Sequence, residues 1–106
     1  MDDLDSLGLH AAVLAAGPST RFGSPKQLVR LGGSPVLHQA AATAASIAGP
    51  SVAVVLGAFA KEIAPALRQS AASIVLNRDW EEGLASTVRV AVRTAPPGCT
   101  GLLLLL

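Results

Sequence analysis

The chain has 106 residues, of which 51% are apolar and 3% aromatic, and its formal net charge is +1 at pH 7. This length allows at most one small domain, and the near-neutral charge argues against nucleic acid or an anionic membrane surface as the partner. No apolar run approaches the roughly 18 residues of a membrane helix, and the single Cys99 leaves no internal disulfide, which agrees with a cytoplasmic protein.

Strands and helices are predicted to alternate along the chain. Residues 1–8 form an acidic leader that lacks the cations of a signal peptide, and the domain covers residues 9–106. Strands are expected at residues 9–15, 51–56, 72–76 and 101–106, and helices at residues 34–48, 59–69 and 83–95. Residues 27–31 should be a short extended piece. Ser34 should cap the first helix, and Pro65 should kink or shorten the second.

This order predicts an α/β fold, a Rossmann-like doubly wound parallel sheet with helices on both faces. Right-handed crossovers favour the strand order 3-2-1-4 for the part present. In that order the first and fourth strands flank the switch point, where ligands bind beyond the carboxyl ends of the strands. The third helix should turn Leu84, Val88, Ala91 and Ala95 inward.

The stretch LAAGPSTRFGSPK, residues 14–26, leaves the first strand at this point. Gly17 can adopt φ angles that other residues avoid, and successive backbone N–H groups in such a turn form a concavity for anions. Arg21 adds a planar fork of donors and Lys26 a compact, mobile charge, so the loop suits a polyphosphate. It is neither a Walker loop nor a G-x-G-x-x-G fingerprint. An ordinary turn that carries two solvated cations fits the same composition.

Carboxylates are unevenly distributed along the sequence. None occurs between Asp5 and Glu62, whereas Arg21, Lys26, Arg30 and Lys61 fall in that interval. This distribution suits an anionic ligand, although chance spacing in an alanine-rich chain explains it equally well.

The loop resembles the signature L-A-A-G-x-S-x-R-x-G-x-P-K of the MobA-like nucleotidyltransferase family, which includes the molybdenum cofactor guanylyl- and cytidylyltransferases. Residues 25–37, 54–58 and 77–86 resemble later blocks of the family in the expected order. The resemblance covers residues 9–106. It is closest to the cytidylyltransferase type, because Ala16 stands where the guanylyl branch usually has a second glycine.

The resemblance implies transfer of a nucleotidyl group, CMP from CTP, to a small phosphorylated acceptor such as the molybdopterin cofactor. Leu14, Ala15, Ala16 and Gly17 would hold the base and the phosphates through main-chain contacts. Arg21 and Lys26 are the implied catalytic residues, because they would neutralise the triphosphate and the charge that develops on the leaving pyrophosphate.

A later block is implied to approach the nucleotide from the other side of the cleft. It contains Asn77, Gly83 and Ser86. From the residues alone, Ser86 fits a helix-surface serine and Asn77 an ordinary turn residue equally well. Trp80 is expected to pack the loop down rather than to stack on a base.

The family also implies Mg²⁺, held by an aspartate that follows the fourth strand. No Asp or Glu stands there in this sequence, so no metal ligand is assigned, and the chain resembles the N-terminal, nucleotide-binding part of the family's domain. We therefore expect weak nucleotide binding, no useful transferase activity from residues 1–106 alone, and self-association through the uncharged apolar strand 101–106.

Two alternative functions remain open at this point. One is a non-catalytic nucleotide-binding module that lacks the metal site. The other is an oxidoreductase-named relative of the same fold, against which the missing G-x-G-x-x-G counts. CTP is favoured over GTP only by Ala16, and no motif identifies the acceptor or the oligomeric state.

Overall fold

The computed structural model describes residues 8–21, 23–31, 34–49, 51–68 and 70–105. Its centre is a four-stranded, all-parallel sheet in the order β7-β6-β1-β8. The strands are β1 (Leu9–Ala15), β6 (Val52–Leu56), β7 (Ser73–Leu76) and β8 (Gly101–Leu105). In chain order this is 3-2-1-4, so the predicted fold class and strand order are confirmed.

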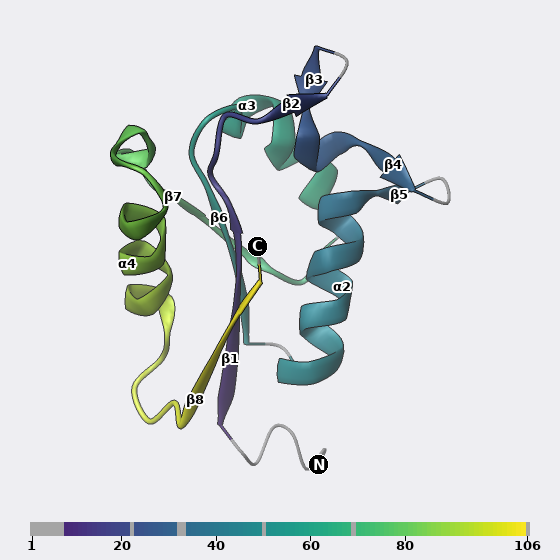
Figure 1. The fold of residues 1–106 in the computed structure, drawn as a ribbon. Coiled ribbons are helices and arrows are strands. Elements are labelled where there is room, and N and C mark those ends of the chain that lie inside the picture. The colour runs from purple at the N-terminus through teal and green to yellow at the C-terminus, as the bar shows by residue number, and fades with distance from the viewer. Residues whose placement is uncertain (1–7, 22, 32–33, 50, 69, 106) are drawn as a thin grey trace.

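Helices cover both faces of this sheet, with α2 and α4 on opposite sides of the strands in Figure 1. One face carries α2 (Val36–Ala48), α3 (Ala60–Ile63) and the 3-10 helix η2 (Ala64–Leu67), and the other carries α4 (Leu84–Thr94). Alternate positions of β1 therefore point into two cores. Val13 packs toward α2, whereas Ala12 packs with Val55 and Ala91 of α4. All five residues of β6 are buried, as expected for a strand covered on both faces.

The core under α2 is built largely from alanine. Leu37 is the one large side chain among the buried residues of this helix, the others being Ala41, Ala44 and Ala48. Small side chains let the helix approach the sheet closely, and each contributes little apolar area to the core.

The connection between β1 and α2 differs from the prediction. Two short antiparallel pairs form there, β2 (Thr20–Arg21) with β3 (Ser24–Pro25) and β4 (Arg30–Leu31) with β5 (Ser34–Pro35), around the 3-10 helix η1 (Lys26–Leu28). Ser34 pairs with Leu31 and does not cap α2, whose N-cap residue is Pro35 without a side-chain cap. The Ser34 cap is therefore wrong, because pairing of the backbone takes its place.

The second helix is shortened at Pro65, as predicted, since α3 ends at Ile63 and continues as the 3-10 helix η2. The inward face of α4 differs from the prediction, because Leu84 is 57% exposed and the buried residues are Ser86, Thr87 and Ala91. A polar network at the start of α4, described below, turns these hydroxyls inward. In the described residues no helix is long and apolar enough to cross a membrane.

Candidate functional site

The loop after β1 begins at the switch point of the sheet. β8 pairs with β1 from Leu9 as far as Val13, so the last two residues of β1 extend beyond that pairing. The Ala58 N–H donates to the Ala16 carbonyl at 3.0 Å, which fixes the first loop residue against the neighbouring β6 connection. The hairpin of β2 and β3 then lies beyond the carboxyl end of β1 (Figure 1).

Gln27 holds both sides of the first turn of this loop, a role that the sequence analysis missed. Its Nε2 donates to the Ala15 carbonyl at 3.2 Å and to the Gly17 carbonyl at 3.4 Å. Reversing the amide would set its oxygen against these two acceptors, so the orientation is fixed by the backbone. Its Oε1 is buried and has no hydrogen-bond partner within the described part of the chain.

The backbone positions of the two residues predicted to be catalytic lie close together along this folded loop. Arg21 belongs to β2 and pairs with Ser24, while Lys26 follows directly after β3. The Lys26 N–H donates to the Ser19 carbonyl at 2.9 Å, which closes the loop, and the Lys26 side chain is exposed. An exposed ammonium at the end of a closed loop is available to an anionic ligand.

The expected special backbone conformation of Gly17 is not found. Gly17 does not lie in the left-handed region, and a Cβ added there would meet nothing within 4 Å among the described residues. In the described part of the loop, the residue in the left-handed region is Gly23, with φ of +78°. The absent side chain of Gly17 therefore leaves open space beside the loop and does not relieve backbone strain.

That open space belongs to two cavities that meet at the loop. One has a volume of about 280 Å³ and includes Ser19, Lys26 and Gln27 in its lining, together with the start of α2. The other has a volume of about 160 Å³ and lies between Pro18, Trp80 and Gly83. Both are lined by Leu14, Gly17 and Leu84.

Leu84 is the second site residue that the sequence analysis missed. Helical periodicity placed it in the core, whereas the structure exposes it at the border of the two cavities. Its position directly after Gly83, in the block that resembles the family, was the available signal.

Trp80 packs next to Gly57, close to Ala16 at the start of the loop. It lies in the 3-10 helix η3 (Trp80–Glu82), so close to Gly57 that a Cβ on that glycine would be 2.6 Å from the Trp80 Cβ and 3.0 Å from the Ala16 Cβ. Only glycine allows this contact. Trp80 is also among the residues that line the smaller cavity, so the same residue packs beside the start of the loop and borders the site.

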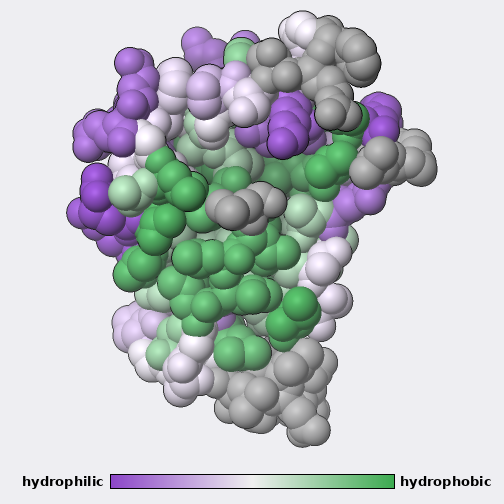
Figure 2. Space-filling model, in the orientation of Figure 1, coloured by the Kyte–Doolittle hydropathy of each residue, from purple (hydrophilic) through white to green (hydrophobic). Residues whose placement is uncertain are grey.

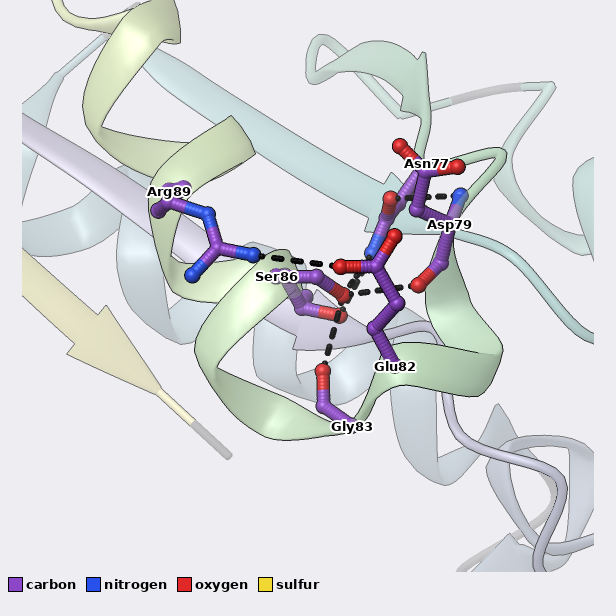
Figure 3. A network of polar contacts seen from close by, with 7 residues as sticks. Asn77, Asp79, Glu82, Gly83, Ser86 and Arg89 are labelled. Carbon is purple, nitrogen blue, oxygen red and sulfur yellow. Dashed lines mark hydrogen bonds and ion pairs between the residues drawn. The ribbon is translucent and has the colours of Figure 1, made fainter.

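Asn77 and Ser86 form a buried network behind the site (Figure 3). Asn77 Nδ2 donates to Ser86 Oγ at 2.9 Å and to Thr87 Oγ1 at 3.0 Å, and its Oδ1 accepts from the Asp79 N–H at 3.0 Å. Ser86 Oγ lies 2.9 Å from the carbonyl oxygen of Asp79 and 2.8 Å from that of Gly83, and its single proton is shared between these two acceptors. This network fixes the start of α4 against the end of β7.

The network places these two side chains differently from the other predicted site residues. Ser86 is 3% exposed and Asn77 is 2% exposed, so both point inward, and their contact with a nucleotide stays a prediction. The ion pair between Glu82 and Arg89 at 3.5 Å is exposed and contributes little. The remaining predicted residues whose side chains or backbone line the two cavities are Leu14, Ala15, Ala16, Gly17, Lys26 and Gly83.

The described residues do not fit a divalent metal. They contain no group of three or more His, Cys, Asp or Glu that could hold one. None of the described carboxylates lines either of the two cavities, whereas Mg²⁺ is bound through carboxylate and phosphate oxygens.

A parallel sheet with a basic loop and paired cavities at its switch point defines the class of α/β proteins that bind ligands beyond the carboxyl ends of their strands. Within that class, the chain belongs to the MobA-like NTP transferase domain family, whose pattern matches residues 11–106. The prediction of the family is confirmed.

Individual proteins show the same relationship. The bifunctional protein GlmU of Mycobacterium avium is 39% identical over 88 residues, which are 81% of this chain and 16% of that protein. GlmU of Mycolicibacterium paratuberculosis matches with the same identity and coverage. The crystal structure of Rv0371c from Mycobacterium tuberculosis superposes with a TM-score of 0.73 at 32% identity, over 92% of this chain and 50% of that one. The chain thus spans half of Rv0371c and a smaller part of GlmU.

Proposed function

We propose that this chain binds a nucleoside triphosphate at the two cavities around residues 14–26, as part of a protein that transfers the nucleotidyl group. The observation that carries this proposal is the shared lining of the cavities. Leu14, Gly17 and Leu84 border both, so one extended ligand can occupy the two hollows on either side of the loop.

The linings of the two cavities differ in chemistry, and this difference is the basis for proposing which part of the nucleotide each cavity binds. The larger one has Lys26, Ser19 and Gln27 in its lining, and an ammonium beside a hydroxyl suits phosphate oxygens. The smaller one is bordered by the flat or apolar surfaces of Pro18, Trp80 and Leu84, which suit a nucleobase. The triphosphate would extend from the base past Gly17, where the missing side chain leaves room for it.

The chemical step depends on positioning and on neutralisation of charge. Attack at the α-phosphorus breaks its bond to the bridging oxygen, and pyrophosphate leaves with the electron pair of that bond. Lys26, with Arg21 from the adjoining hairpin, would offset the negative charge that grows on this leaving group. The family's Mg²⁺ enters no step here, because the described residues lack carboxylates that fit it.

The proposed substrates, CTP and an acceptor, are more specific than membership of the family. Ala16, which is 3% exposed and lines the smaller cavity, stands where the guanylyl branch usually has a glycine, and this difference is the basis for proposing CTP over GTP. A small phosphorylated acceptor of the molybdopterin type follows from the cytidylyltransferase resemblance. That residues 1–106 alone lack useful transferase activity remains a prediction.

Calorimetric titration with CTP and GTP tests the site. Lys26→Ala should weaken binding by about 1.5–3 kcal/mol, the contribution of a hydrogen bond to a charged group, and Arg21→Ala should act similarly. Lys61→Ala is the matched control, because Lys61 is also exposed but lies in α3 outside both cavities. Equal affinity in the wild type and in Lys26→Ala would overturn the assignment, and tighter binding of GTP would overturn the choice of CTP.

A further inference from the structure

A third cavity, separate from the two at the loop, lies against the central sheet. It has a volume of about 650 Å³, within the roughly 300–1,000 Å³ of typical small-molecule sites. It lies over β6 and β7 on the face that α4 covers, and it reaches the amino end of β1 at His10. Its apolar lining comes chiefly from Val75, Leu76 and Val90.

His10 gives this cavity a fixed polar border. The ring is 4% exposed and lies between two hydroxyls, with Nδ1 2.7 Å from Ser51 Oγ and Nε2 2.8 Å from Thr94 Oγ1. Thr94 donates its only hydroxyl proton to the Ala91 carbonyl at 2.6 Å, so it must accept from Nε2–H. Nδ1 is then the acceptor, and Ser51 donates to it, which leaves the lone pairs of Ser51 Oγ for other donors.

Two further groups on the cavity have unused hydrogen-bonding capacity. Within the part of the chain that the structure describes, neither Arg93 nor Ser73 makes a side-chain hydrogen bond or ion pair. Arg93 lies in the last turn of α4 and Ser73 at the start of β7, and both line the cavity. A guanidinium and a hydroxyl on one cavity offer several donors to a ligand.

The charges around this cavity favour an anion. The described residues contain four carboxylates, and none of them lines this cavity. They are Glu62, Asp79, Glu81 and Glu82. The guanidinium of Arg93 is therefore not offset by an acidic neighbour in the cavity, and an oxyanion would form charge-assisted hydrogen bonds with it.

We propose that this cavity is a second binding site, for a small organic anion whose carboxylate or phosphate binds Arg93 and Ser73 while a compact apolar body packs on Val75, Leu76 and Val90. The site shares no lining residue with the two cavities at the loop. It is therefore independent of the proposed nucleotide site, and either can fail while the other holds.

The imidazole NMR resonances of the two histidines, His10 and His38, can report on binding at this cavity. Benzoate, phenyl phosphate and inorganic phosphate are titrated into the protein while the imidazole resonances are followed by NMR. His10 borders this cavity and His38 does not, so a specific ligand should shift the His10 resonances saturably and leave those of His38 in place. The tighter of the two aromatic probes identifies carboxylate or phosphate as the preferred anion.

Substitutions distinguish binding at this cavity from a general response of the protein to salt. Arg93→Gln should weaken binding at least about tenfold, since a charged hydrogen bond is lost, whereas Arg89→Gln, one turn earlier and outside the cavity, should not. Ser73→Tyr should block the cavity without changing its charge. The proposal is overturned if neither aromatic probe shifts His10 saturably, if Arg93→Gln binds like the wild type, or if inorganic phosphate binds as tightly as phenyl phosphate.

Discussion

Gly17 belongs to the loop after β1 and Gly57 lies next to Ala16 at its start, and the structure predicts opposite effects on stability when each is changed to alanine. At Gly57 the new Cβ would lie 2.6 and 2.9 Å from the Trp80 Cβ and Cγ, well inside the 3.4–4 Å of ordinary van der Waals contact. Trp80 and Ala16 would have to move. Overpacking of this kind costs about 1–3 kcal/mol, and the reduced entropy of the unfolded chain offsets about 0.4–1 kcal/mol of that.

The expected net effect of Gly57→Ala is a loss of about 1–2 kcal/mol of unfolding free energy. For a domain of this size that corresponds to a fall in Tm of about 4–15 °C. Gly17→Ala should melt at or above the wild-type temperature, because nothing lies within 4 Å of its Cβ. It should instead weaken nucleotide binding, since the added methyl group would occupy space bordered by both cavities.

Thermal melts followed by circular dichroism measure the first effect, and calorimetric titration with CTP measures the second. Emission from Trp80, the only tryptophan, reports whether the indole has moved in Gly57→Ala. A Gly57→Ala protein that melts like the wild type would refute the packing argument. A Gly17→Ala protein that is destabilised as much as Gly57→Ala would refute the contrast between the two glycines.

Two further predictions concern buried polar groups. Burial lowers the pKa of His10 below its ordinary 6.5, so the stability that depends on its neutral form is present above pH 6.5 and is lost as pH falls through the lower folded value. Urea unfolding at pH 7.5 and 5.5 should show this loss of unfolding free energy in the wild type and in His38→Gln. The loss should be smaller in His10→Gln. Among the residues that line the same cavity as His10, the charged one is Arg93. Asn77→Ala should cost about 1–3 kcal/mol, because it removes the donor to Ser86 and Thr87 and the acceptor for the Asp79 N–H. The neighbouring Arg78→Ala, at an exposed position, should cost much less, and equal unfolding free energies of the two variants would contradict the role of the network.

The sheet was predictable because its signals are local and strong. β1 has the predicted bounds, and each of the other three strands begins or ends within one residue of its prediction. Buried strands of a parallel sheet are continuous apolar runs, and Gly or Pro marks several of the connections between them. Because crossover connections between parallel strands are right-handed, few topologies were possible. The order of the strands in the sheet therefore followed from the order of the elements in the chain.

The parts that were not predicted depend on contacts between residues that are distant in sequence or on very short segments. The hairpins of β2 with β3 and of β4 with β5 have strands of two residues, too short to show a period. His10 is bound by Ser51 and Thr94, which are 41 and 84 positions away. Ser86 was placed near the nucleotide by resemblance, but its hydroxyl bonds to Asp79 and Gly83, which only the folded turn brings within reach.

The last prediction concerns the exposed apolar strand β8. In the described residues β8 pairs with β1 along one edge, and its leucines face both sides of the sheet. Leu102, Leu103 and Leu104 are 36%, 36% and 39% exposed, and Figure 2 shows a continuous hydrophobic surface where this strand lies. The strand contains no charge, proline or bulge, the features that protect natural edges from pairing with another chain.

Residues 1–106 should therefore self-associate by adding the edge of β8 to that of a second copy. Leu104→Lys should raise the monomer fraction, because pairing would bury a lysine beside the partner strand. Ile47→Lys changes an equally exposed apolar residue on α2, away from both sheet edges, and should leave association unchanged. Light scattering over a concentration series measures both. Wild-type protein that stays monomeric at high concentration would show that this edge does not pair, and equal effects of the two lysines would show that association depends on general hydrophobicity and not on the strand.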